Sequence, residues 1–300
     1  MKVSVCTLAH GREEHLINMV KGLSLSSVLP DELVIAVMQD VPYDLPHTDF
    51  PIRQIMLGSG SIPLARARNT AATKAAGEIL IFLDVDCIPH SECISDYIKA
   101  SHANSGVWMG EVGYLPKDAT RDGIQYDRFD RIAVRHSERP GPPDTGARSC
   151  EDYRCFWSLN FAISAKDFRA SGGFDEAFDG YGGEDTDFGR TLSARDIPLW
   201  WIKGARTYHQ YHPHFMPPVH HLDSVLANAM TFARKWGHPT MQHWLRAFVL
   251  MGLLERTDNG WRKLRDPGES DFALTRQQAD QPYASSARVL AALEAEAMAG

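Results

Sequence analysis

Cysteine is scarce in this chain and is not spaced for cross-linking. Its five cysteines are an odd number and include no Cys-x-x-Cys pair. Neither a disulfide framework nor a cysteine-based zinc site is therefore expected. The opening residues Met1-Lys2-Val3-Ser4-Val5-Cys6 enter a strand-like run without the layout of a signal peptide. We therefore expect a protein of the reducing cytoplasm.

An excess of positive charge and a long apolar run are also lacking. Lys and Arg number 31 against 38 Asp and Glu, which gives a net charge of −7. Nucleic acid is not an expected partner, because binding to a phosphate backbone requires a basic face. No apolar run reaches the roughly 20 residues of a membrane helix, so no integral membrane segment is expected. The apolar Trp244–Leu254 segment leaves peripheral membrane attachment open, with core packing as the alternative.

The first 90 residues alternate between strand and helix signals. Short apolar runs predict strands and apolar spacing of three or four predicts helices. The predicted strands are Val3–Leu8, Leu33–Met38, Pro51–Leu57 and Ile79–Leu83, and the predicted helices are Glu13–Leu25 and Leu64–Ala76. Repeated β-α-β units of this kind favour an α/β fold with a parallel, doubly wound sheet.

The rest of the chain is less regular. Residues 115–155 are polar and without periodicity, which predicts a long loop that serves as a lid. Further strands and helices are expected from Phe156 onward, including a helix over Glu184–Arg195. Helices are also predicted over His221–Trp236 and Pro239–Glu255. The Ala-rich end, Gln278–Gly300, is either a surface helix or loosely attached.

Two carboxylates end the fourth predicted strand, in Phe82-Leu83-Asp84-Val85-Asp86. Open α/β sheets place their ligand crevice at the carboxyl ends of the strands. Carboxylate oxygens there suit Mg²⁺ or Mn²⁺, which in turn suit phosphate oxygens. The alternative is that these acids only cap the strand.

A second acidic group follows pairs of glycines. Gly172-Gly173-Phe174-Asp175-Glu176 precedes Tyr181-Gly182-Gly183-Glu184-Asp185-Thr186-Asp187. Glycine lets the backbone approach a ligand closely, and the acids fall in the first turn of a predicted helix. Acids also favour a helix N-terminus for electrostatic reasons alone, but that does not explain the two Gly-Gly pairs.

Histidines cluster late in the chain, in Tyr208-His209-Gln210-Tyr211-His212-Pro213-His214 and in His220-His221. One interpretation is a structural zinc site, although neither cysteines nor a His-Glu-x-x-His pattern supports it. Another is that one histidine completes the metal site of the aspartates. A third is that most are ordinary loop residues.

Together these motifs resemble the family 2-type glycosyltransferases of the GT-A fold. The resemblance covers residues 1–215 and includes a Gly-Gly-Glu-Asp segment similar to that of β-1,4-galactosyltransferases. It is carried by four stretches in the expected order, namely Val3–Arg12, Ala67–Asp86, Asn160–Phe178 and Tyr181–Asp185.

The resemblance implies a domain plan. Residues 1–215 would form the catalytic domain, with 1–110 as the nucleotide-sugar half and 111–215 as the acceptor half. A helical extension would follow over residues 216–265, and a tail over 266–300.

The resemblance also implies roles for individual residues. Asp185 would be the catalytic base, and Glu184 would hold the acceptor. Asp86 would bind Mn²⁺ or Mg²⁺, with His209 or the competing His212. Residues along the nucleotide sugar would be Ala9, His10, Arg12, Arg68, Asp84, Asp86 and, with its register uncertain, Asp40. Aromatic stacking adds Trp157 and Tyr181 to Asn160 and Glu184 at the acceptor.

The implied activity is the metal-dependent, inverting transfer of a sugar from a nucleotide-diphosphate sugar to a hydroxyl of a glycan or small acceptor. The expected donor is a UDP-sugar. Three alternatives stay open: a retaining enzyme of the same fold, a nucleotidyltransferase and a non-catalytic nucleotide-sugar-binding module. The loop His10–Glu14 has too little glycine for a typical nucleotidyltransferase. The opening loop and the Gln39-Asp40 strand end depart from the family pattern, which leaves the nucleotide base open. The donor sugar, the acceptor and the oligomeric state do not follow from the sequence.

Overall fold

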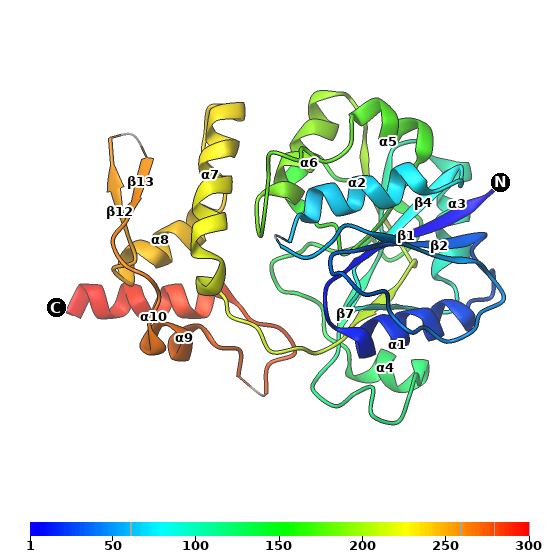
Figure 1. Ribbon diagram of the computed structural model, residues 1–300, viewed down its shortest axis with the longest axis horizontal. Coiled ribbons are helices and arrows are strands. Elements are labelled where there is room, and N and C mark those ends of the chain that lie inside the picture. Colours follow the sequence, from blue (N-terminus) through cyan, green and yellow to red (C-terminus); the bar gives the residue numbers. More distant parts are fainter. Residues whose placement is uncertain (61, 259, 279, 300) are drawn as a thin grey trace. The chain divides into compact units, whose positions relative to one another are not determined.

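The computed structural model describes residues 1–60, 62–258, 260–278 and 280–299 (Figure 1). The chain forms two compact units. The first unit contains Met1–Glu176 and Glu184–Tyr211, and the second contains Ala177–Gly183 and His212–Gly300. The segment that precedes the Glu184-Asp185 pair therefore belongs to a different unit from the pair itself.

The first unit is built on an eight-stranded sheet of order β3-β2-β1-β4-β9-β6-β10-β8. The sheet is parallel except for β9 and β8. This agrees with the predicted α/β fold, whose sheet was expected to be mainly parallel. Its strands are β1 (Val3–Ala9), β2 (Glu32–Val37), β3 (Ile52–Met56), β4 (Ile79–Leu83), β6 (Val107–Met109), β8 (Ala147–Ser149), β9 (Asn160–Ser164) and β10 (Leu199–Ile202).

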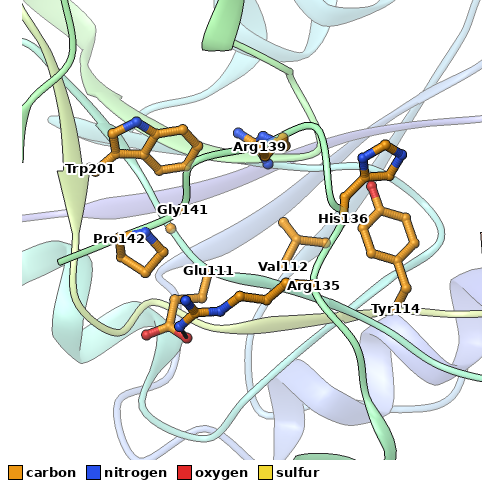
Figure 2. A pocket seen from close by; sticks show the side chains of 10 residues that line it. Glu111, Val112, Tyr114, Arg135, His136, Arg139, Gly141, Pro142 and Trp201 are labelled. Carbon is orange, nitrogen blue, oxygen red and sulfur yellow. Dashed lines mark ion pairs between the residues drawn. The ribbon is translucent and has the colours of Figure 1, made fainter. Parts of the chain in front are cut away.

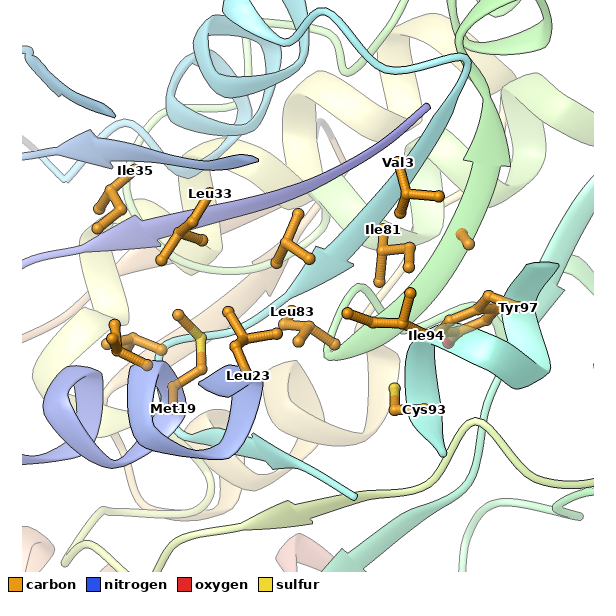
Figure 3. Close-up of a cluster of buried hydrophobic side chains, with 14 of the residues drawn as sticks. Val3, Met19, Leu23, Leu33, Ile35, Ile81, Leu83, Cys93, Ile94 and Tyr97 are labelled. Atoms are coloured by element: carbon orange, nitrogen blue, oxygen red, sulfur yellow. The ribbon is translucent and has the colours of Figure 1, made fainter. Parts of the chain in front are cut away.

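Helices cover both faces of this sheet, and each face has its own core. Figure 3 shows the core in which α1 (Glu13–Ser24) and α3 (Cys93–Ala103) pack on one face. The opposite core contains α2 (Leu64–Lys74), α5 (Ala165–Ser171) and α6 (Glu184–Ala194). Central strands such as β1 and β4 are buried along their whole length, which explains their continuous apolar runs.

A smaller sheet, of order β5-β11-β7, lies beyond the end of β4. Its strands are β5 (Cys87–Pro89), β7 (Val112–Tyr114) and β11 (Thr207–His209). The antiparallel β5–β11 pairing sets His209 opposite Cys87, which directly follows Asp86. This pairing brings the late histidine to the early aspartate.

The prediction of an irregular loop over residues 115–155 holds for most of the stretch, but three short elements lie within it. This stretch contains α4 (Tyr126–Ile132), β8 and a short 3₁₀ turn, η1 (Tyr153–Cys155). Phe129 of α4 is fully buried in a small separate core with Tyr208. Helix α4 has about two turns, and β8 and η1 have three residues each. Elements this short carry no periodic signal in the sequence.

The second unit is mainly helical. It contains η2 (Val219–His221), α7 (Leu222–Trp236), α8 (Gln242–Leu250), a hairpin of β12 (Leu254–Thr257) and β13 (Gly260–Lys263), α9 (Glu269–Thr275) and α10 (Ser286–Ala299). The helix expected over Pro239–Glu255 is shorter than predicted, because Gly252 has a φ of +67° and the chain continues as a strand. Asn228 of α7 donates hydrogen bonds to the carbonyls of Asp179 and Gly182, at 3.0 and 2.8 Å. A search of the described helices finds none that is long and apolar enough to cross a membrane.

The aromatic packing behind the strand ends gives a stability prediction. Phe161 of β9 is fully buried and stacks on Phe82 with ring centroids 4.5 Å apart. Phe161→Ala should lower the free energy of unfolding by about 3–5 kcal/mol in urea titrations, through lost burial and a cavity. Phe161→Leu should cost clearly less, and equal losses would contradict this packing.

Candidate active site

One buried arginine is shared by three carboxylates. Arg68 of α2 has only 4% of its side chain exposed. Its Nη2 lies 3.3 Å from Asp84 Oδ1, and its Nη1 lies 3.2 Å from Glu184 Oε1. The same Nη1 is 3.8 Å from Asp185 Oδ1, and the guanidinium rests over the ring of Phe174 at 5.3 Å. The end of β4, helix α2 and the start of α6 therefore meet at a single cation.

The charges of this cluster do not balance when all three acids are ionised. Burial opposes the charge of Arg68, but the surrounding carboxylates outweigh burial and raise its pKa. Burial, with the charge of Asp185 added, raises the pKa of Glu184 to about 7. Burial likewise raises the pKa of Asp84 to about 6, although Arg68 opposes the increase. The cluster therefore holds a proton near neutral pH.

Asp185 is the most accessible acid of the three. Its side chain is 28% exposed, compared with 23% for Asp84 and 8% for Glu184. Asp185 Oδ2 accepts a hydrogen bond from the backbone N–H of Ser158 at 3.0 Å. A carboxylate that is oriented by a backbone donor and still accessible is well placed to accept a proton from a bound hydroxyl group.

A candidate metal site lies beyond the same strand. Ligand atoms of Asp86, His209 and His212 all lie within 4.8 Å of one another. The N–H of Gln210 donates to the carbonyl of Asp86 at 2.7 Å, which fixes the segment that carries both histidines. His212 is the first residue of the second unit, and it follows His209 by only three positions in the chain.

The donor atoms fit a divalent cation. One carboxylate and two imidazole groups suit Mn²⁺ better than Mg²⁺, which prefers oxygen ligands throughout. Arg12, at the start of α1, forms an ion pair with Asp86. The guanidinium of Arg12 therefore places a fixed positive charge beside this candidate ligand.

The other residues predicted along the nucleotide lie at the carboxyl ends of β1 and β2. Ala9 is buried in the sheet, and its carbonyl accepts the N–H of Met38, whereas His10 is exposed. Asp40 is exposed and accepts hydrogen bonds from the backbone and hydroxyl of Ser59.

The three predicted acceptor residues besides Glu184 have different environments. Trp157 is half-buried beside Ser158, next to Asp185. Asn160 is fully buried, and its amide bonds to Tyr97 and to the carbonyls of Glu111 and Ala205. Asn160 therefore connects β9 to α3 and to the backbone that follows β6 and β10. Tyr181 lies in the second unit, where it stacks on His221 with ring centroids 4.8 Å apart.

Sequence reasoning missed one pocket in the first unit, lined in part by Glu111, Arg139 and Trp201 (Figure 2). Its residues come from segments far apart in the chain. The only signal was the basic and proline-rich stretch 135–143, which was interpreted as irregular loop.

Family models match consecutive parts of the chain. Residues 42–149 match the model described as "Glycosyl transferase family 2", and residues 148–213 match "N-terminal domain of galactosyltransferase". These matches support a family 2 glycosyltransferase, and the fold is of the GT-A type. The family resemblance inferred from its motifs is thus confirmed.

Individual relatives agree with this family. A validoxylamine A glucosyltransferase of Streptomyces hygroscopicus subsp. jinggangensis (strain 5008) is 37% identical over 202 residues, which are 59% of this chain and 45% of the relative. The chain thus spans less than half of that relative.

Two solved structures share the fold. S. aureus TarS matches with a TM-score of 0.54 and 13% identity, over 83% of this chain and 43% of that one. GalNAc-T7, solved with UDP, GalNAc and Mn²⁺, matches with a TM-score of 0.52 and 16% identity, over 70% of this chain and 43% of that one.

The raised pKa of Glu184 predicts a pH-dependent stability. The folded protein binds this proton more tightly than the unfolded chain does, so its contribution to stability is greatest at low pH. That contribution falls as the pH rises from 4.5 to about 7. Between these two pH values, the free energy of unfolding should decrease by about 1–3 kcal/mol less in Glu184→Gln than in the wild type.

The measurement is urea unfolding at a series of pH values in EDTA. Glu14→Gln, at an exposed acid of α1, is the matched control and should keep the wild-type slope. A Glu184→Gln slope equal to that of the wild type would contradict the assigned protonation.

Proposed function

We propose that this chain transfers a sugar from a UDP-sugar to a hydroxyl of a glycan or small acceptor, with inversion at the anomeric carbon. The observation that carries the proposal is the cluster around Arg68. It joins Asp84, at the end of the predicted donor strand, to the accessible Asp185 at distances of 3.3 and 3.8 Å. Donor-side and acceptor-side motifs thus meet within one unit.

The comparisons support the choice of donor. The relative from Streptomyces is named as a glucosyltransferase, and the GalNAc-T7 structure contains UDP, GalNAc and Mn²⁺. A UDP-sugar with Mn²⁺ is therefore the first donor to test. The donor's sugar and the identity of the acceptor stay outside the proposal.

Asp86, His209 and His212 would hold the divalent cation. When bound, Mn²⁺ would act as a Lewis acid that neutralises charge on the departing diphosphate. Arg12, which pairs with Asp86, brings a cation to the same end of the sheet and is positioned to contact phosphate oxygens. Arg68 keeps the acids of the cluster in place.

Asp185 would act on the acceptor. Its Oδ2 would take the proton of the attacking hydroxyl, while the Ser158 N–H keeps the carboxylate oriented. Attack from the face opposite the diphosphate inverts the anomeric carbon. Glu184, whose Oε1 accepts a hydrogen bond from Arg68, would position the neighbouring base and hold the acceptor.

Asp185→Asn tests the base directly. With UDP-sugar, Mn²⁺ and acceptor, kcat should fall by roughly 10²–10⁴-fold, because the amide cannot accept the proton. The Kd for UDP, measured by calorimetry, should stay unchanged. Glu14→Gln should behave as the wild type in both assays. An Asp185→Asn enzyme with wild-type kcat would remove Asp185 from this role.

The metal site has a separate test that does not depend on turnover. Titration of Mn²⁺ followed by electron paramagnetic resonance should show at least about tenfold weaker binding for Asp86→Asn and for His209→Ala. His102→Ala, at an exposed histidine of α3, is the control and should bind Mn²⁺ normally. Unchanged affinity in both site variants would place the cation elsewhere.

A further inference from the structure

The pocket in Figure 2 is a second feature of the first unit, distinct from the carboxylate cluster. Its interior and open mouth together measure about 320 Å³, which includes solvent, and the cavity proper is about 20 Å³, enough for a small group rather than a whole sugar. Its walls come from the segment that includes β7, from residues 135–142 and from Trp201 of β10. Figure 2 shows Arg139 beside Trp201 on one side, with Glu111 and Arg135 together on another.

The single acid of this pocket already has several cations. Glu111 lies 2.9 Å from Arg206, 3.1 Å from Lys203 and 3.6 Å from Arg135. Burial would raise the pKa of Glu111, but hydrogen bonds from Arg206, the Gly204 N–H and Lys203 outweigh burial and lower it. Its negative charge is therefore not available to Arg139. The pocket has an excess of positive charge in a chain whose net charge is −7.

Arg139 lies between two indoles. Its guanidinium is 4.9 Å from the ring of Trp157 and 4.7 Å from that of Trp201. Among the residues that the structure describes, Arg139 forms no ion pair; its Nη2 makes one long bond, 3.4 Å, to the carbonyl of Cys155. Nε is buried without a hydrogen-bond partner. Burial lowers the pKa of Arg139, although nearby groups, Asp185 among them, oppose the decrease.

Aromatic contacts connect this pocket to the candidate active site. Tyr114, in the pocket wall, stacks on His209 with ring centroids 4.8 Å apart. His136, also in the wall, meets Trp157 edge-on at 5.0 Å. Trp157 directly precedes Ser158, whose N–H holds Asp185. A molecule in the pocket would therefore lie against the residues that flank the proposed base and metal ligands.

We propose that this pocket binds an anionic group of the acceptor, a carboxylate or a phosphate, and that Arg139 is its main contact. A guanidinium pairs with either group through two parallel hydrogen bonds, and it is more weakly hydrated than an ammonium. The flanking indoles lower the polarity around the guanidinium, which strengthens a pair with an anion. The inference rests on the proposed function only in naming the ligand an acceptor.

A purely structural role is the alternative for Arg139. In that case its cation–π contacts only hold residues 135–142 in place. Arg148 provides a matched control, because its Nη2 donates to the carbonyl of Gly141 at 2.8 Å and restrains the same segment from outside the pocket. Loss of anion binding on changing Arg139, but not Arg148, separates recognition from loop support.

The experiment is calorimetric titration of the full chain with three probes: glucuronate, glucose 6-phosphate and glucose. Saturating UDP and Mn²⁺ are present, so that phosphate does not enter the proposed donor site. At least one anionic sugar should bind about tenfold or more tightly than glucose, as a charge-assisted pair would give. The preferred anion distinguishes a carboxylate-bearing from a phosphate-bearing acceptor.

Arg139→Gln should abolish this preference, Arg139→Lys should retain part of it, and Arg148→Gln should retain all of it. Thermal melting confirms that each variant is folded. Equal affinities of the wild type for all three probes, or an undiminished preference in Arg139→Gln, would overturn the inference, as would equal losses in the Arg139 and Arg148 variants. A retained preference in a protein without sugar transfer would refute the proposed function and leave this site standing.

Discussion

The sharing of Arg68 among three buried or half-buried carboxylates is the constraint on which the site depends. One cation cannot neutralise Asp84, Glu184 and Asp185 together. Burial raises the pKa of Asp84 and of Glu184, which brings the charges closer to balance, and the cluster ties α2, the end of β4 and the start of α6 together. Loss of the arginine would leave these acids buried without compensation, which is costly in any protein interior.

The sheet determines where this cluster stands. β4 is a central, fully buried strand, so the acids that follow it emerge at the carboxyl edge of the sheet. The β5–β11 pairing then returns the chain to the same edge and sets His209 near Asp86. The two charge centres, one around Arg68 and one around Asp86, thus lie on either side of a single residue, Val85.

Much of this fold could be predicted from the sequence. The strands β1, β2, β3 and β4 are continuous apolar runs between turn residues, and such runs identify buried parallel strands. The short elements of residues 115–155 could not be predicted, because their stability comes from packing against Tyr208 and its neighbours rather than from local pattern. The early end of α8 has a different cause, the positive φ of Gly252, after which the chain continues as a strand.

The candidate site was predictable only in part. Motif spacing singled out Asp84, Asp86, Glu184 and Asp185. One sequence does not show that an arginine of α2 lies between Asp84 and the Glu184-Asp185 pair. Arg68 was expected along the nucleotide, yet it is 4% exposed and bonded to acids. The surroundings of Arg139 depend on Trp157 and Trp201, which are 44 residues apart in the chain and which tertiary packing brings to the same guanidinium.

The central claim is that burial in the Arg68 cluster raises the pKa of Glu184 to about 7, so that this carboxyl is largely protonated just below neutral pH. The most direct measurement is an infrared difference spectrum between the wild-type protein and Glu184→Gln, recorded in the carboxyl region at about pH 6.5, just below the value to which burial raises this pKa. The account predicts a band of a protonated carboxylic acid that is present in the wild type and absent from the variant. A spectrum that contains only carboxylate bands, with no protonated carboxyl to lose, would contradict it.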